Sequence, residues 1–335
     1  MEPEGEYEVV ENRFQRRTTG PLGIAQGFSA FILALFFIVV APHSYAQSSD
    51  AYVLKNVEQR TIPAKNGDIY RVFIIKPQAP APESGYPVLY ALDGNSVAAL
   101  FSTLSRSHSG RNELSGFEPG LVVAVGYPTD NLLDMRRRSR DYTPAKATPN
   151  SGTYLKPEDT GDAERFLDFI EQELKPAIQA EFKTNPSRQS IYGHSFGGLF
   201  VLHALLTRPG TFANYISASP SIWWADRAIL KTSAEFLSRK PALNSVSVFL
   251  MVGGLEQTVT PDQAAAKDAK DIAIRLQERR MVGDAREMAE RLASLKEGGL
   301  SVRFEEIPNE THNSVTLLSA IKAYRFAFQI RKPVK

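Results

Sequence analysis

The chain has 335 residues, of which 43% are hydrophobic and 23% are charged, and its formal net charge at pH 7 is +2. This is the composition of an ordinary globular protein, and it argues against intrinsic disorder. Because basic and acidic residues nearly balance, it also argues against binding of nucleic acid or another polyanion.

The beginning of the chain has the pattern of an export signal. Arg13, Arg16 and Arg17 precede an uncharged apolar run at 28–41, and the small residues that a signal peptidase reads follow at 44–46. This run is shorter than the roughly 20 residues that a membrane-spanning helix needs, so an uncleaved anchor is the less favoured alternative. We predict that residues 1–46 form a signal peptide, that residues 47–335 form one exported, periplasmic domain, and that any membrane contact comes only from an uncleaved signal.

The exported part alternates between strand-like and helix-like segments. Strands are expected at 51–61, 68–75, 87–92, 121–125, 190–192, 212–218, 245–252 and 300–307. Helices are expected up to residue 107, at 162–182 with a bend at Pro176, after residue 195, and at 262–280, 283–296 and 315–330. The alternation predicts an α/β fold with a mainly parallel sheet, helices on both faces, and ligands beyond the carboxyl ends of the strands.

Three segments of the chain predict more specific local structures. Asn66-Gly67 predicts a hairpin between the first two strands. The polar, Arg-rich segment 130–154 is too long for a simple connector, which indicates a functional loop. The charged segments 262–280 and 283–296 are typical of a solvated helical pair.

Ser195 stands in a Gly-x-Ser-x-Gly motif between a short β-rich run and a helical apolar pattern. In a nucleophile elbow of this kind, Gly193 and Gly197 are needed because strand and helix converge too closely for side chains. The turn places the serine hydroxyl at a helix N-terminus, where a developing negative charge is favoured. We predict a nucleophile; the alternative is a structural Gly-rich turn.

His312 is the best candidate for the base that a nucleophilic serine requires. It follows the last expected strand in a polar loop and lies C-terminal to the serine, as the chain order of an α/β hydrolase demands. His194 flanks the nucleophile, His203 is expected in the core, and His108 lies in a polar loop. An exposed loop histidine is commonplace, so the hypothesis depends on the elbow.

The acid that holds the imidazole should follow the penultimate strand. Glu256 is at that place, with Asp262 and Asp226 as alternatives, and the alternative reading of Glu256 is a solvated surface residue. For the oxyanion hole, we predict the backbone amide of Phe196 and that of Asn95, with Gly94 next in order.

Five motifs together resemble a known family. YALDGN at 90–95, RSRDYTP at 138–144, GHSFGGLF at 193–200, SPSIWW at 219–224 and THNSV at 311–315 are similar to the esterase branch of the α/β hydrolases that contains the periplasmic, enterobactin-type siderophore trilactone esterases. The likeness covers roughly residues 51–330. The resemblance implies that Ser195 is the nucleophile, that His312 is the base, and that the amides of Asn95 and Phe196 form the oxyanion hole. Some siderophore esterases work with a Ser-His pair alone, so Glu256 is the least secure member.

The resemblance also implies a use for the Arg-rich loop. A ferric tricatecholate is a bulky trianion, so Arg140, supported by the arginines at 136–138, is expected to meet it, with Trp223 or Trp224 stacking on its rings. The alternatives are solvated arginines and core tryptophans. Asp93 is expected to bind a substrate hydroxyl or only to shape its loop.

The sequence therefore predicts a serine esterase that hydrolyses a siderophore trilactone or a related ferric-siderophore ester, without a metal or other cofactor in catalysis. A general carboxylesterase or acyltransferase of the feruloyl, S-formylglutathione or antigen 85 type is the nearest alternative. A non-catalytic binding protein on the same fold is the other.

Overall fold

The computed structural model describes residues 52–108, 116–149, 155–243 and 245–330. The predicted export signal lies outside these ranges and stays a prediction. No helix within the described ranges is both long and apolar enough to cross a bilayer.

The described residues form an eight-stranded sheet in the order β1-β2-β4-β3-β5-β6-β7-β8. The strands are β1 (Val57–Pro63), β2 (Ile69–Ile75), β3 (Tyr86–Leu92), β4 (Leu121–Gly126), β5 (Thr184–His194), β6 (Asn214–Ala218), β7 (Ser247–Gly253) and β8 (Ser301–Ile307). From β4 across to β8 all pairings are parallel, whereas β1 with β2 and β2 with β4 are antiparallel. The expected mainly parallel sheet is confirmed.

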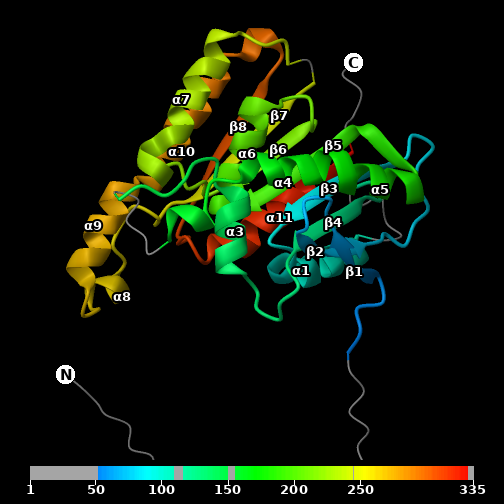
Figure 1. The fold of residues 1–335 in the computed structure, drawn as a ribbon, viewed down its shortest axis with the longest axis horizontal. Coiled ribbons are helices and arrows are strands. Elements are labelled where there is room, and N and C mark those ends of the chain that lie inside the picture. Colours follow the sequence, from blue (N-terminus) through cyan, green and yellow to red (C-terminus); the bar gives the residue numbers. More distant parts are fainter. Residues whose placement is uncertain (1–51, 109–115, 150–154, 244, 331–335) are drawn as a thin grey trace, which may run out of the picture. The chain divides into compact units, whose positions relative to one another are not determined.

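The helices are α1 (Gly94–Ser107), α3 (Met135–Tyr142), α4 (Ala163–Phe169), α5 (Lys175–Glu181), α6 (Phe196–Thr207), α7 (Trp224–Ser238), α8 (Pro261–Ala264), α9 (Ala269–Arg279), α10 (Met281–Ala293) and α11 (Val315–Phe328). One apolar core packs α4, α6 and α7 on one face of the sheet, and a second core packs α1 and α11 on the other (Figure 1). The central strands β3 and β4 are buried almost throughout, which explains their continuous apolar runs.

Two segments differ from the sequence-based expectation. The long polar segment after β4 contains the two-turn helix α3, whose N-cap Asp134 accepts a hydrogen bond from the amide of Arg137 at 3.0 Å. The charged sequence of α3 has no helical periodicity of apolar residues, so the sequence did not predict this helix. The prediction of a solvated helical pair at 262–280 and 283–296 is confirmed for the first helix and wrong for the second. Helix α9 has no buried residue, whereas α10 buries one face and packs against β7 and β8.

The helix expected at 162–182 is interrupted near the predicted bend. A single turn of π-helix at Ile170–Leu174 separates α4 from α5, just before Pro176. Proline has no amide hydrogen to donate, and a π-turn is a common way to accommodate such a break. The prediction of a bend at this proline is thus close to the observed irregularity.

The sheet places the ends of four strands around one point. Because β3, β5, β7 and β8 run parallel, their carboxyl ends share one edge, and the segments that follow them carry Asp93, Ser195, Glu256 and His312. Loops at this edge are the usual ligand-binding position of an open α/β sheet.

Candidate active site

Ser195 stands at the turn between β5 and α6. Its backbone has φ 62° and ψ −118°, a left-handed conformation that residues other than glycine rarely adopt. Gly193 is required because a Cβ at this position would lie 2.3 Å from the carbonyl oxygen of Gly197. The amide of Ser195 donates to the carbonyl of Ala218 at 3.0 Å, which ties the turn to β6. The hydroxyl therefore sits at the N-terminus of α6 in a strained elbow.

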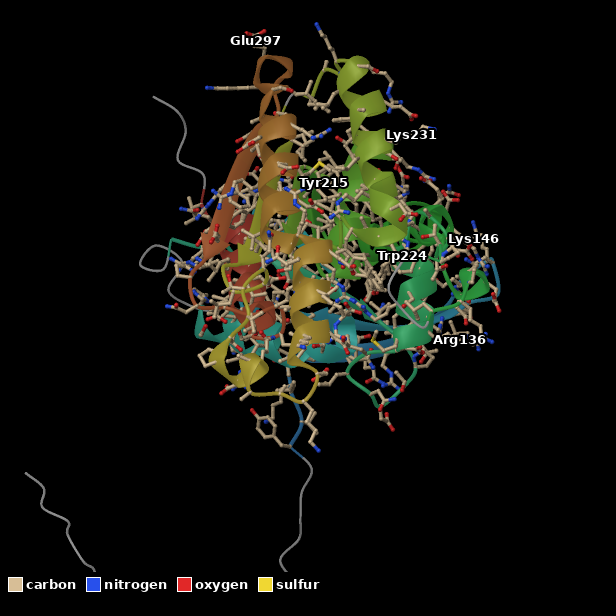
Figure 2. The ribbon with its side chains drawn as sticks, turned by 90° about the vertical axis from the view of Figure 1, so that its left-hand side faces the viewer. Arg136, Lys146, Tyr215, Trp224, Lys231 and Glu297 are labelled. Atoms are coloured by element: carbon tan, nitrogen blue, oxygen red, sulfur yellow. The ribbon has the colours of Figure 1, made fainter. Side chains whose placement is uncertain are left out.

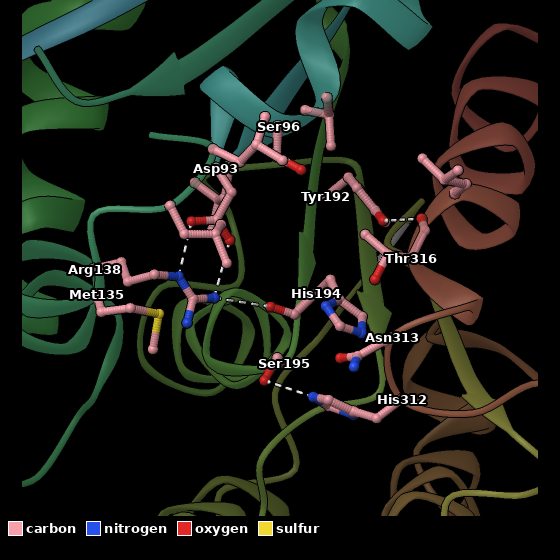
Figure 3. Close-up of a pocket in the computed structure, with 15 residues that line it drawn as sticks. Asp93, Ser96, Met135, Arg138, Tyr192, His194, Ser195, His312, Asn313 and Thr316 are labelled. Carbon is pink, nitrogen blue, oxygen red and sulfur yellow. Dashed lines mark hydrogen bonds and ion pairs between the residues drawn. The ribbon is translucent and has the colours of Figure 1, made fainter. Parts of the chain in front are cut away.

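The imidazole of His312 connects Ser195 to Glu256. Its Nε2 lies 3.0 Å from Ser195 Oγ, a contact drawn as a dashed line in Figure 3, and its Nδ1 lies 2.6 Å from Glu256 Oε2. When Nδ1–H donates to the carboxylate, the Nε2 lone pair faces the serine hydroxyl. This is the tautomer that can accept the serine proton.

The carboxylate of Glu256 is fully buried and fully engaged. Its side chain is 0% exposed, and Oε1 accepts from the hydroxyl of Ser219 at 2.5 Å and from the amide of Gly253 at 2.7 Å. A buried carboxylate is stable only with such partners, and here they leave Oε2 for His312. The alternatives, Asp226 and Asp262, lie in α7 and α8 instead. The reading of Glu256 as a solvated surface residue is wrong.

A cavity of about 490 Å³ opens beside Ser195. Its walls come from the end of β3 and the start of α1, the segment from the β4–α3 loop into α3, the elbow, and the region around the start of α11. The lining residues are Leu92, Asp93, Ser96, Val97, Leu132, Leu133, Met135, Arg138, Tyr192, His194, Ser195, His312, Asn313, Thr316 and Leu317.

Arg138 and Asp93 form a buried ion pair in the wall of this cavity. Arg138 donates from Nε and from Nη2 to the two carboxylate oxygens of Asp93, each at 2.9 Å (Figure 3). Burial by itself would lower the pKa of Arg138, but the Asp93 carboxylate outweighs it and raises this pKa. Among the residues that the structure describes, Nη1 has no hydrogen-bond partner. Arg138 therefore offers one positively charged N–H group at the cavity.

The ring of His194 packs beside that of His312, with 4.7 Å between the ring centroids. Burial lowers the pKa of His194 well below its usual range, and the electrostatic effect of the nearby His312 and Arg138 adds to it. His194 is therefore neutral at pH 7. It puts no second positive charge beside the imidazole that must accept a proton.

The predicted oxyanion role of Asn95 concerns its backbone amide and stays a prediction, whereas its side chain binds the loop after β4. Its side chain accepts from the amide of Tyr127 at 2.9 Å and donates to the carbonyls of Tyr127 and Thr129 at 3.1 and 2.7 Å. The side chain of Asn95 therefore braces the loop after β4, and Asn95 is not among the residues that line the cavity.

Arg140 lies elsewhere than predicted. It pairs with Asp68 at 3.0 Å and with Asp141 at 2.8 Å, and it is absent from the cavity wall. Arg136 is 81% exposed and pairs with Asp159; its side chain extends outward from α3 in Figure 2. Since successive residues of a helix face different directions, only Arg138 among the four arginines reaches the cavity.

The tryptophans belong to the interior rather than to the cavity. Trp224, labelled in Figure 2, is 1% exposed, donates from Nε1 to the carbonyl of Ala145 at 2.8 Å and packs edge-on against Phe196. Trp223 is partly buried, with the guanidinium of Arg279 4.4 Å from its ring centroid. Neither lines the cavity, so the prediction that one of them stacks on substrate does not fit this structure.

The other two predicted residues lie at the site. Phe196 is the first residue of α6, so its amide is among the first-turn amides that lack an intrahelical acceptor. Asp93 lines the cavity, but both of its oxygens are held by Arg138.

Sequence analysis missed the particular importance of Arg138 and the apolar part of the cavity wall. Arg138 and Tyr142 are four residues apart and both buried, so recognising α3 would have placed them on one inward face. Leu132, Leu133 and Leu317 carried no signal, because isolated surface leucines are common.

The chain matches the family model described as putative esterase over residues 64–294. It is 37% identical over 287 residues to ferri-bacillibactin esterase BesA of Bacillus subtilis, an alignment that covers 84% of this chain and 92% of that protein. It is 35% identical over 238 residues to a siderophore enterobactin esterase of Emericella nidulans, covering 68% of this chain and 77% of the relative. The siderophore hydrolase EstB from Aspergillus nidulans superposes with a TM-score of 0.71 at 31% identity, covering 85% of this chain and 99% of that structure.

A mainly parallel sheet with a serine elbow after β5 and a histidine after β8 defines an α/β hydrolase. The chain belongs to the putative esterase family, and it is a carboxylic ester hydrolase. The resemblance seen in its motifs is confirmed at the level of the family.

Proposed function

We propose that this protein is an exported serine esterase that cleaves the ester bonds of a siderophore trilactone or a related ferric-siderophore ester. The observation that carries the proposal is the hydrogen-bonded series Ser195, His312 and Glu256 beside the cavity. The substrate class rests on the relatives, which are named as esterases and hydrolases of siderophores.

In this mechanism, Ser195 Oγ attacks the ester carbonyl carbon while His312 Nε2 accepts the hydroxyl proton. The imidazolium then gives this proton to the departing alcohol oxygen, which leaves an acyl group on the serine. Water enters, loses a proton to the same nitrogen, and releases the acid. Glu256 keeps the ring in its working tautomer and stabilises its positive charge.

The negative charge that develops on the carbonyl oxygen requires donors placed beforehand. The amide of Phe196 is one donor in the proposed mechanism, because it lies at the N-terminus of α6 directly after the nucleophile. The Nη1 group of Arg138 is the second, because Asp93 holds the guanidinium rigidly while leaving this nitrogen without a partner among the described residues. Arg138 would act in addition to the backbone amide of Asn95, which the sequence predicts for this role.

Hydrolysis of a trilactone would release iron by simple physical chemistry. Three chelating arms on one ring act at a high effective concentration, which falls when the ring is opened or divided. The iron is cargo of the substrate. Export follows from the predicted signal at 1–46 and is proposed together with the function.

The test uses protein that starts at residue 47, with Ser195→Ala as the control. Products from a ferric siderophore trilactone are followed by mass spectrometry alongside a nitrophenyl acyl ester. We expect conversion of the trilactone to linear fragments, dependent on Ser195. Hydrolysis of the nitrophenyl ester alone would retain the catalytic serine and reject the siderophore substrate.

Arg138→Met is expected to lower both activity and stability. It leaves the Asp93 carboxylate buried without its partner, at a cost of about 3–5 kcal/mol in the free energy of unfolding. It also removes one oxyanion donor, so kcat should fall by about 10²-fold or more. Urea unfolding and steady-state kinetics measure the two effects.

Arg140→Met is the matched control on the same helix. This variant should lose stability through Asp141 but keep kcat within about threefold, because Arg140 does not line the cavity. Equal losses of kcat in both variants would mean that Arg138 acts only by holding α3 in place.

A further inference from the structure

The charge and polarity of the cavity bear on which siderophore ester fits it. Resting on the proposed function, we propose that the preferred substrate is an ester whose ferric complex has no net charge, such as a ferric trihydroxamate, rather than a trianionic ferric tricatecholate. Three hydroxamates, each with a single negative charge, balance ferric iron. Three doubly charged catecholates leave the complex with an excess of negative charge.

The positive charge in the described cavity wall is balanced by a carboxylate. Arg138 is matched by Asp93 in a two-point ion pair, and the buried carboxylate of Glu256 accepts a hydrogen bond from His312, whose Nε2 must be unprotonated to act as the base. His194 is held neutral by burial first, and by the charge of Arg138 nearby. An anionic complex would thus enter a low-dielectric site that has no unbalanced positive charge to replace its hydration.

The arginines of α3 that could have changed this balance are engaged outside the cavity. Arg140 is held by Asp68 and Asp141, and Arg136 by Asp159. The guanidinium of Arg137 lies 4.8 Å from the ring centroid of Tyr127 and donates to the carbonyl of Ile69 at 2.8 Å. The basic cluster in the sequence is therefore not a basic surface at the cavity.

Apolar side chains stand at the cavity where charged ones would be needed. Leu132 and Met135, from the segment after β4, are 67% and 42% exposed, and Leu317, in the first turn of α11, is 56% exposed. Leu133 lies beside them at 40% exposure, and all four line the cavity. Apolar side chains gathered at a binding cavity favour a ligand with apolar or uncharged surface.

The test compares a ferric trihydroxamate triester with a ferric tricatecholate trilactone, with rates in Ser195→Ala subtracted. For the native enzyme, we expect a KM at least about tenfold lower for the uncharged complex, a factor that corresponds to about 1.4 kcal/mol. We also expect the KM of the uncharged complex to change little between low and high salt.

A charge placed at the cavity mouth makes the test independent of other differences between the two substrates. Measured against Leu132→Gln, which removes the same apolar side chain without adding a charge, Leu132→Arg should lower the KM of the trianionic complex about fivefold at low salt, whereas the two variants should agree within about twofold in the KM of the uncharged complex. Leu132→Gln, which is polar but uncharged, should not produce this selective gain.

An equal or lower KM for the trianion in the native enzyme would overturn the inference, as would a gain from Leu132→Gln equal to that from Leu132→Arg. If neither complex is cleaved in a Ser195-dependent way while a nitrophenyl ester is, the proposed function itself fails. The two failures are therefore distinguishable.

Discussion

His312→Ala is expected to lower kcat by about four powers of ten on every ester that the enzyme cleaves, with the fold intact. The reason is that Nε2 of His312, 3.0 Å from Ser195 Oγ, is the group placed to take the serine proton. A neutral serine hydroxyl is a poor nucleophile without a base, and triad members act as a unit, so little activity should remain. Steady-state kinetics and circular dichroism measure the two quantities.

His108→Ala is the matched histidine control. His108 packs its ring 4.6 Å from that of Phe117, and it does not line the cavity that contains Ser195. Its removal should leave kcat within about twofold. A His312→Ala enzyme that kept more than a tenth of the native kcat would remove this histidine from the catalytic mechanism.

The second large effect is expected for Glu256→Gln, with a fall in kcat of about 10³-fold and a KM within about threefold of the native value. Glutamine has the size of glutamate, but it has no negative charge to stabilise the imidazolium and can present an amide donor to Nδ1. The close contact of 2.6 Å to His312 and the complete burial of Glu256 are the basis of this expectation.

Asp262→Asn gives the control for Glu256→Gln. Asp262 was the alternative acid in the sequence and lies in the first turn of α8, where the loss of its charge should not alter kcat. Activity of Glu256→Gln close to native would show that a Ser-His pair is sufficient. The buried carboxylate would then have only a structural role at the ends of β7 and β8.

The sequence predicted the parts of the site that depend on local or ordered signals. The elbow at Ser195 is local, since the glycines, the strand and the helix are contiguous. His312 and Glu256 follow from chain order, because an α/β sheet places the ends of successive parallel strands along one edge. The positions of the strands follow from apolar runs that are buried on both faces.

The rest of the site depends on the direction in which side chains point. The sequence predicts this direction only where a helical or strand periodicity of apolar residues can be seen. Arg138 and Arg140 are two residues apart, so they lie on different sides of α3. Arg138 lines the cavity, whereas Arg140 forms an ion pair with Asp68. The family resemblance implied a binding role for Trp223 or Trp224, yet tertiary packing places Trp224 in the core. Asn95 has the expected position in the chain, and its side-chain amide binds the loop after β4, which the sequence did not indicate.

The central claim is that Ser195 is a nucleophile activated by His312. Its most direct test is the reaction of the protein from residue 47 onward with a fluorophosphonate, followed by intact mass and peptide mapping. We predict a single adduct on Ser195 that is absent in Ser195→Ala and forms at least about 100-fold more slowly in His312→Ala. An adduct on another residue, or a labelling rate unchanged by His312→Ala, would contradict the claim.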